Sequence, residues 1–292
     1  MREDKRDFES GKHLRYEEYF QGENNGLFIK IKEFLFSKQS KYQRIDIFDS
    51  YDVGRVFALD GITQTIEKFE FMYHEMLVHV AMFSHRNPKR VLIIGGGDGG
   101  TLREVLRHSC VKEAVLCEID EDVVLVAKEY LPSLACSMND ERAQLLFKDG
   151  AAYVSQFEDY FDVIIIDSTD PTAGEGGHLF TVDFYKRCNR ALTKDGLLVA
   201  HSENPVYDTN WLKMAYSRIE EAFVLAEMYT GFSPQYPSGF WTYTVGTKGI
   251  DPTMKIRKDN LLENELKYYN EQIHAACFVL PVFLNDIIRN IR

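Results

Sequence analysis

The chain has 292 residues, of which 45% are hydrophobic, and 34 Lys and Arg against 45 Asp and Glu give it a formal net charge of −11. This composition is typical of a soluble globular protein. Nucleic acids and anionic membranes are recognised by positively charged surfaces, so an acidic chain is a poor match for either. Cationic small molecules are the better electrostatic match, and we expect partners of that kind.

Five cysteines are scattered along the chain without a C-x-x-C pair, which indicates neither a disulfide framework nor a zinc knuckle. The first ten residues are rich in charge, and no run approaches 18 apolar residues. The sequence therefore predicts no signal peptide and no membrane span. The expected location is the reducing cytoplasm.

Residues 1–69 are predicted to form a small all-β domain. Aromatic and β-branched residues alternate with polar ones over 27–32 and 43–48, which is the period of a half-buried strand. From residue 70 the spacing becomes helical and continues to residue 83. We therefore expect a second domain over residues 70–292 that begins with a helix.

Strands and helices alternate in the second domain. Apolar runs predict strands near 91–94, 113–118, 144–148, 161–166 and 196–201, and helices near 101–108, 121–130, 150–157, 181–192 and 209–221. This alternation is typical of a parallel sheet with helices on both faces. Strands near 224–230 and 240–247 predict a closing antiparallel hairpin, and a C-terminal helix is expected. The predicted fold class is α/β, a doubly wound Rossmann-like sheet.

Acidic residues follow four of the predicted strands. They are Asp98 within the glycine run 95–100, Glu118, Asp149 beside Gly150, and the pair Asp167 and Asp170. Ligands of doubly wound sheets bind outside the carboxyl ends of the strands. We therefore expect these side chains to meet in one site.

The glycine run matches G-x-G-x-x-G, and Glu118 follows it at the spacing of a ribose-binding acid. A carboxylate at Asp98 would repel the pyrophosphate of a dinucleotide, whereas an S-adenosyl compound without phosphate suffers no such penalty. Capping of the next helix is the alternative role of Asp98. Glu118 offers two oxygens to the ribose hydroxyls or is an exposed loop acid. Asp149 with Gly150 suits the edge of adenine or forms an ordinary turn.

Asp167 and Asp170 bracket a tight turn, and such a pair suits binding and deprotonating a cation. The alternatives are a turn with a helix cap, or a metal site. Neither a histidine nor a third acid stands at ligand spacing there, so no metal is expected. The glycine-rich stretch 172–177, which contains Gly174, is predicted to be a mobile gate.

These residues lie in motifs that resemble the spermidine synthase family of polyamine aminopropyltransferases. The motifs are ALDG and EF-x-YHEM within 58–76, VLIIGGGDGG-x-LREV over 91–105, CEID, DSTDP, YPSG over 236–239 and LKYYN-x-x-x-H-x-A-x-F-x-LP over 266–281. The resemblance implies transfer of the aminopropyl group of decarboxylated S-adenosylmethionine to putrescine, which gives spermidine and methylthioadenosine. It implies a class I methyltransferase-like sheet, no prosthetic group, and a homodimer or homotetramer assembled through the β region.

The resemblance also assigns roles to residues. Asp167 is the expected general base, Asp170 holds the attacking diamine, and Asp98 binds the propylamine group while repelling the carboxylate of S-adenosylmethionine. The residues expected to bind the diamine are Tyr73, His74, Asp98, Asp167, Ser168, Thr169, Asp170 and Tyr236. Those expected to bind the donor nucleoside are Gln43, Gly95, Gly97, Asp98, Glu118, Asp149, Gly150 and Gly174. Ordinary packing is the alternative for Tyr73, Tyr236 and above all His74.

Three departures from the family pattern leave the acceptor open. Arg15 replaces an expected tryptophan, Gly174 replaces proline, and His201-Ser202-Glu203 replaces a Gln-Gly-Glu type sequence. Putrescine, agmatine, cadaverine and spermidine remain possible acceptors. The alternative classes are an S-adenosylmethionine-dependent methyltransferase and a catalytically silent polyamine-binding protein. Asp98 and the closing hairpin argue against a dinucleotide oxidoreductase.

Overall fold

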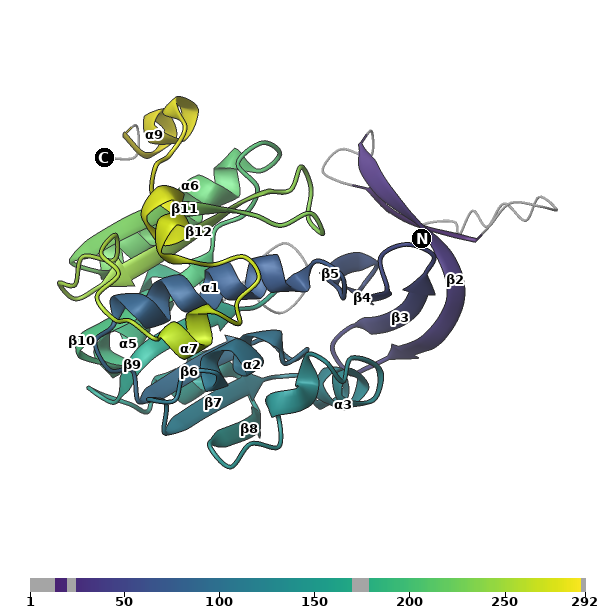
Figure 1. The fold of residues 1–292 in the computed structure, drawn as a ribbon, viewed down its shortest axis with the longest axis horizontal. Coiled ribbons are helices and arrows are strands. Elements are labelled where there is room, and N and C mark those ends of the chain that lie inside the picture. Colours follow the sequence, from purple (N-terminus) through teal and green to yellow (C-terminus); the bar gives the residue numbers. More distant parts are fainter. Residues whose placement is uncertain (1–13, 20–24, 170–178, 290–292) are drawn as a thin grey trace.

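Two β-sheets organise the computed structural model, which describes residues 14–19, 25–169 and 179–289 (Figure 1). Within these ranges the smaller sheet has five antiparallel strands in chain order. They are β1 (Arg15–Tyr19), β2 (Gly26–Gln39), β3 (Arg44–Ser50), β4 (Arg55–Leu59) and β5 (Ile62–Ile66). The all-β character predicted for the N-terminal region is confirmed.

Side chains of the small sheet alternate between its two faces, and each face packs into its own apolar cluster. In β3, Ile45 and Ile47 point to one face and pack against Val123 of helix α3 (Glu121–Tyr130). Phe48 belongs to a second cluster, and its ring lies 4.9 Å from that of Tyr16. Burial of the first face attaches the small sheet to the larger body of the molecule.

The larger sheet has seven strands within the described residues, in the order β11-β12-β10-β9-β6-β7-β8. They are β6 (Arg90–Gly95), β7 (Glu113–Glu118), β8 (Ala143–Phe147), β9 (Phe161–Asp167), β10 (Leu192–His201), β11 (Leu225–Phe232) and β12 (Phe240–Thr247). Strands β6 to β10 are parallel, whereas β12 is antiparallel to both β10 and β11. The predicted doubly wound sheet and its closing hairpin are confirmed.

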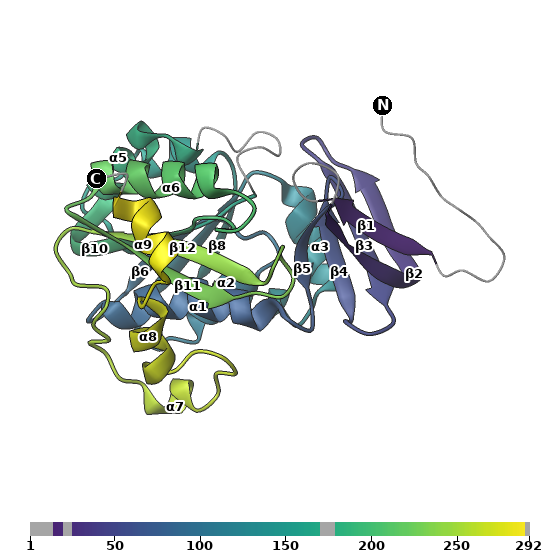
Figure 2. The ribbon, with the colours of Figure 1, turned by 90° about the horizontal axis from the view of Figure 1, so that it is seen from above.

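Helices cover both faces of this sheet (Figure 2). One face carries α1 (Glu70–Ser84), α2 (Gly100–Leu106) and α8 (Glu271–Cys277), and the other carries α4 (Gly150–Val154), α5 (Val182–Ala191), α6 (Thr209–Ala222) and α9 (Val282–Arg289). Val91 and Ile93 of β6 pack on the first face, and Leu92 and Ile94 pack on the second. Burial on both faces explains why this strand is a continuous apolar run.

The C-terminal part departs from the single helix that was predicted. In its described residues the chain forms α7 (Asn260–Glu263) and then α8 and α9. Pro281 precedes α9, and proline lacks the amide hydrogen that would continue α8 into it. Within the described ranges no single helix is long and apolar enough to cross a membrane, although α8 and α9, bent by 54°, meet that test as a pair.

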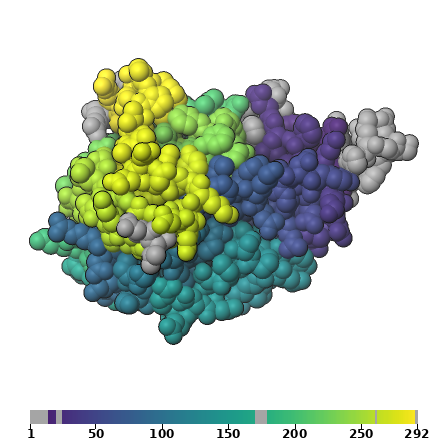
Figure 3. Space-filling model, in the orientation of Figure 1, coloured from purple at the N-terminus to yellow at the C-terminus, as the bar shows by residue number. Residues whose placement is uncertain are grey.

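Helix α1 is buried almost all round because the C-terminal segment covers it (Figure 3). Glu75 on this helix is 1% exposed. Its carboxylate accepts three backbone hydrogen bonds, from Lys267 at 2.9 Å and from Tyr268 and Tyr269 at 2.8 Å. One buried charge therefore fixes the segment that leads to α8.

Replacing Glu75 by alanine should leave these three amide groups without their acceptor. Because buried unsatisfied donors and lost charge-assisted hydrogen bonds each cost a few kcal/mol, we expect Glu75→Ala to lower the free energy of unfolding by about 3 kcal/mol. Denaturant unfolding at a fixed protein concentration measures this. An unchanged midpoint would show that water replaces the carboxylate.

Candidate active site

The strand order of the large sheet reverses between β6 and β9. From β6 the chain continues outward to β7 and β8, whereas β9 lies on the other side of β6 and leads to β10. Gly95 at the end of β6 pairs with Asp167 at the end of β9. Ligands bind at the carboxyl ends of strands at such a reversal, so this is the expected place for a site.

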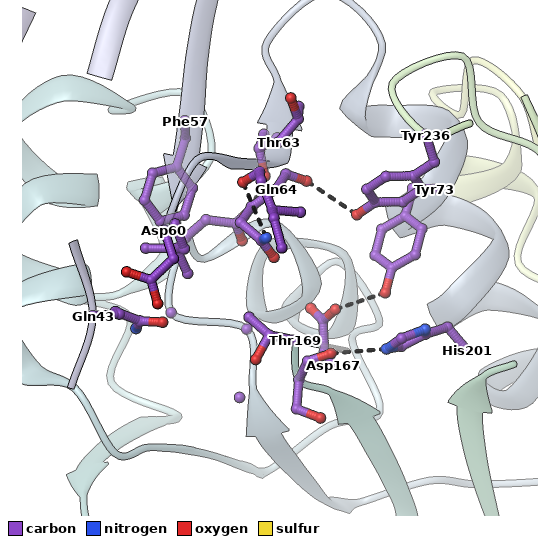
Figure 4. Close-up of a pocket in the computed structure, with 18 of the residues that line it drawn as sticks. Gln43, Phe57, Asp60, Thr63, Gln64, Tyr73, Asp167, Thr169, His201 and Tyr236 are labelled. Atoms are coloured by element: carbon purple, nitrogen blue, oxygen red, sulfur yellow. Dashed lines mark hydrogen bonds between the residues drawn. The ribbon is translucent and has the colours of Figure 1, made fainter. Parts of the chain in front are cut away.

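A cavity of about 720 Å³ opens at this point, and residues of both sheets line it (Figure 4). Among the described residues that line it, none is Lys or Arg and eight are acidic. The eight are Glu17, Glu18, Asp60, Asp98, Glu118, Asp167, Glu203 and Asp208. A cleft whose charged side chains are mostly of one sign concentrates ligands of the opposite sign, so the cavity favours cations.

Asp167 is held at the end of β9 by two hydroxyl groups. Tyr73 donates to its Oδ1 at 2.8 Å, and Thr101 donates to its Oδ2 at 2.6 Å. Gly95 has a φ of +83°, and a Cβ there would lie 2.2 Å from the backbone oxygen of Asp167. Only glycine allows β6 and β9 to approach so closely while turning into the loop.

Asp98 is 7% exposed, and its carboxylate holds the start of the next helix while its role in donor binding stays a prediction. Its Oδ1 accepts the amide of Gly100 at the start of α2 at 2.9 Å, and its Oδ2 accepts the hydroxyl of Thr65 at 2.5 Å. Burial raises the pKa of Asp98, the charge of His74 lowers it, and the charge of Asp167 raises it. Asp98 lines the cavity, with Thr65 of the small sheet beside it.

His74 directs both of its ring nitrogens at acids. Nδ1 lies 2.6 Å from Oε2 of Glu70, and Nε2 lies 3.6 Å from Oδ2 of Asp98. Burial by itself lowers the pKa of His74, but the charges of Asp98 and Glu70 outweigh that effect and raise the pKa to about 9. The two carboxylates that face its nitrogens therefore favour the protonated ring.

Three of the residues expected to hold the donor nucleoside, Gln43, Gly97 and Glu118, lie at the end of β7. Glu118 is 9% exposed, and burial raises its pKa to about 7. Its Oε1 accepts the amide of Asp120 at 3.0 Å, while Gln43 donates its side-chain amide to Asp120 at 3.2 Å. A Cβ at Gly97 would lie 3.0 Å from Oε2 of Glu118. The glycine loop therefore passes directly over this carboxylate.

Asp149 caps a helix, whereas its neighbour Gly150 lines the cavity. The carboxylate of Asp149 caps α4, accepting the amides of Ala151 at 2.7 Å and Ala152 at 3.0 Å. Gly150 lines the cavity, whereas Asp149 is not among the described lining residues. Asp149 is therefore the N-cap of a helix rather than part of an ordinary turn, and its contact with adenine stays a prediction.

Aromatic rings form a wall beside Asp167. The ring of Tyr236 lies 5.3 Å from that of Tyr73 and 4.4 Å from that of Trp241. Ser168 and Thr169, which follow Asp167 in the chain, also line the cavity. Trp241 was not predicted, although its place two residues after the YPSG turn, at the start of β12, was a usable signal. Aromatic faces and acids together suit an alkyl chain with cationic ends.

His201 supports the loop that follows Asp167. Its Nε2–H donates to the backbone oxygen of Ser168 at 2.8 Å, and its ring stacks on Trp241 at 6.0 Å. The sequence marked His201 only as a departure from the family pattern. Its contact with the loop arises because β10 and β9 are neighbouring parallel strands.

The other predicted residues lie elsewhere or outside the described ranges. The guanidinium of Arg15 lies 5.1 Å from the ring centre of Phe28, and Arg15 is not among the described lining residues. Asp170 and Gly174 fall in residues 170–178, outside the described part of the chain. Within that part, no group of three or more His, Cys, Asp or Glu side chains could hold a metal ion.

Comparisons with known proteins agree with this arrangement. Residues 70–258 match the family model of the spermine/spermidine synthase domain, and residues 15–67 match that of the spermidine synthase tetramerisation domain. Curated polyamine aminopropyltransferases of Thermotoga petrophila and Thermotoga maritima are 54% and 55% identical over 97% of this chain and 97% of their own.

Solved structures match as well. A spermidine synthase in complex with the transition-state analogue AdoDATO superposes with a TM-score of 0.92 at 54% identity, covering 96% of both chains. Spermidine synthase from Thermotoga maritima superposes with a TM-score of 0.90 at 51% identity, covering 95% of both chains. The resemblance found in the motifs is confirmed, and the chain is a transferase that belongs to the spermidine synthase family of polyamine aminopropyltransferases.

Proposed function

We propose that the chain transfers the aminopropyl group of decarboxylated S-adenosylmethionine to putrescine, giving spermidine and methylthioadenosine. The observation that carries this proposal is the pair of carboxylates Asp98 and Asp167 in a cavity whose described lining has no Lys or Arg. Both substrates carry ammonium groups at neutral pH, and the donor also carries a sulfonium. The two acids provide a counterion for each substrate.

The donor nucleoside binds at the ends of β6 and β7. In this proposal Glu118 accepts the two ribose hydroxyls, and Gln43, Gly95, Gly97 and Gly150 enclose the rest of the nucleoside. Asp98 pairs with the propylamine end of the donor. S-adenosylmethionine carries a carboxylate at that end, so the fixed negative charge of Asp98 repels it.

Asp167 acts as the general base. It takes a proton from the acceptor ammonium, and the freed nitrogen lone pair attacks the carbon next to the sulfonium. The carbon–sulfur bond breaks with its electron pair going to sulfur, so methylthioadenosine leaves uncharged. Burial and the charge of Asp167 raise the pKa of Tyr73 well above its usual value, so Tyr73 keeps its proton and orients the carboxylate.

The acceptor lies along the aromatic wall of Tyr73 and Tyr236, with Ser168, Thr169 and Asp170 at its attacking end. For His74 we propose an indirect part, because both of its nitrogens are directed at acids of the protein.

We also propose a homodimer or homotetramer assembled through the small sheet. The match of residues 15–67 to a tetramerisation domain supports this, as do exposed aromatic side chains on that sheet, Phe28 at 60% and Phe34 at 45%. Five free cysteines fit a reducing compartment, which supports a cytoplasmic location.

Incubating the protein with decarboxylated S-adenosylmethionine and one amine at a time tests the function. Putrescine, agmatine, cadaverine and spermidine form the panel, and chromatography follows methylthioadenosine. We expect rapid release with putrescine. Release with another amine alone would correct the acceptor, methyl transfer from S-adenosylmethionine would indicate a methyltransferase, and donor binding without turnover would indicate a silent binding protein.

Replacing Asp167 by asparagine should lower kcat by at least about 100-fold, because the amide cannot accept the proton. Binding of methylthioadenosine, measured by calorimetry, should change little. Asp162→Asn is the matched control, since Asp162 lies at the opposite end of β9 and accepts the backbone amides of Lys89 and Arg90. A near wild-type rate in Asp167→Asn would remove this residue from the role of base.

Affinity for methylthioadenosine should depend on pH through Glu118. Its pKa of about 7 means that the carboxyl group is protonated at lower pH, where it no longer offers two acceptor oxygens to the ribose. We expect the dissociation constant to rise as pH falls below about 7, approaching tenfold for each further drop of one in pH. Glu118→Gln should bind weakly without this dependence, whereas Glu113→Gln, at the other end of β7, should keep it. The same pH dependence in Glu118→Gln would assign it to another group.

A further inference from the structure

A buried series of alternating charges leads to Asp98. Arg103 of α2 donates to both carboxylate oxygens of Glu70, at 3.1 and 2.8 Å. Glu70 lies 2.6 Å from Nδ1 of His74, whose Nε2 lies 3.6 Å from Asp98. The side chains of Glu70, His74 and Asp98 are 8%, 2% and 8% exposed. Such isolation from water makes each charge sensitive to its neighbours.

The surroundings of His74 favour its doubly protonated form. Glu70 on α1 and Asp98 in the loop before α2 face its two nitrogens, and the charge of Asp167 on β9 acts in the same direction. A nitrogen that faces a carboxylate is stabilised with its proton on. A Cβ at Gly100 would lie 2.3 Å from the imidazole, so the ring lies tightly against α2.

Asp98 needs a neighbouring cation because its surroundings oppose ionisation. It is buried, and Asp167 adds a second negative charge in the same cavity. Among the described lining residues no Lys or Arg compensates. The hydroxyl of Thr65 and the amide of Gly100 supply hydrogen bonds but no full charge. His74 supplies the positive charge that a carboxylate in this place requires.

We propose that Glu70 is a positioning residue for the donor: by holding His74 as an imidazolium, it keeps Asp98 negatively charged for the ammonium end of the aminopropyl group. The inference rests on the proposed function, because it assumes that Asp98 receives that ammonium. Glu70 itself is not among the described residues that line the cavity, so it acts only through His74. Arg103 fixes the Glu70 carboxylate toward the imidazole.

The charge of Asp98 also affects the selectivity of the site between the decarboxylated donor and S-adenosylmethionine. When Asp98 is ionised it attracts the ammonium of the decarboxylated donor and repels the carboxylate of S-adenosylmethionine. When Asp98 is protonated it does neither. Loss of the Glu70 charge should therefore weaken binding of the decarboxylated donor. It should at the same time strengthen inhibition by S-adenosylmethionine.

The test is the pH profile of kcat/KM for the decarboxylated donor in Glu70→Gln. Without the Glu70 charge, His74 loses its proton at neutral pH and the pKa of Asp98 rises, so the acid limb of the profile moves to higher pH. We expect kcat/KM at pH 7 to fall at least about tenfold and to recover as pH rises, because the ionised fraction of a carboxyl group falls about tenfold for each step of one in pH below its pKa. Affinity for methylthioadenosine, which lacks the amine, should stay unchanged.

Glu75→Gln is the matched control. Glu75 is also a buried acid of α1, but it binds the backbone at residues 267–269 and not His74. We expect a loss of stability with the acid limb in its wild-type place. A uniform loss of kcat/KM at every pH in Glu70→Gln, with wild-type inhibition by S-adenosylmethionine, would reduce Glu70 to a structural role and overturn the proposal.

If Glu70→Gln does not fold, a measurement on the wild-type protein still tests the proposal. Nitrogen NMR of labelled histidine, with the His74 signal assigned from a His74→Gln variant or from its response to bound donor, reports the protonation state directly. An imidazolium at about pH 7.5 is the expected result, and a neutral ring would overturn the inference. Wild-type protein that neither binds nor consumes the donor would overturn the proposed function, and this inference with it.

Discussion

The parallel pairing of β6 with β9 is the interaction on which the site depends. It places Gly95 opposite Asp167, so that two segments far apart in the sequence deliver their carboxylates to one cavity. The missing Cβ of Gly95 permits this approach, since any larger residue would meet the backbone of Asp167. The glycine loop after β6 and Asp167, the proposed general base, thus form a single structural unit.

Bringing acids together in this way creates repulsion that the fold must offset. It does so largely with neutral donors: Tyr73 and Thr101 hold Asp167, and Thr65 holds Asp98. These hydroxyls stabilise carboxylates without cancelling their charge. The cavity therefore stays acidic for a cationic ligand, and the ring of His74 beside Asp98 also faces the carboxylate of Glu70.

The small sheet completes this arrangement. It supplies Thr65 to Asp98 and the backbone oxygen of Gln64 to the hydroxyl of Tyr236 at 3.0 Å. Its attachment through Ile45, Ile47 and α3 therefore affects the geometry of the cavity. Anything that moves this sheet relative to the large one will disturb the contacts of both Asp98 and Tyr236 in the cavity.

The order of strands and helices and the acids at the strand ends could be predicted from the sequence, because both follow from local pattern. Buried parallel strands are short apolar runs, and a residue that follows such a run lies at the carboxyl edge of the sheet whatever surrounds it. Which groups each acid contacts became known from the folded structure. Asp149 caps α4, His74 joins Glu70 to Asp98, and His201 supports Ser168. The cap of Asp149 and the pairing of Glu70 with His74, four residues apart on α1, are local, whereas the other contacts join separate elements. Side-chain charge in a cavity is set by burial and by neighbours that are distant in the sequence, and no local pattern encodes either.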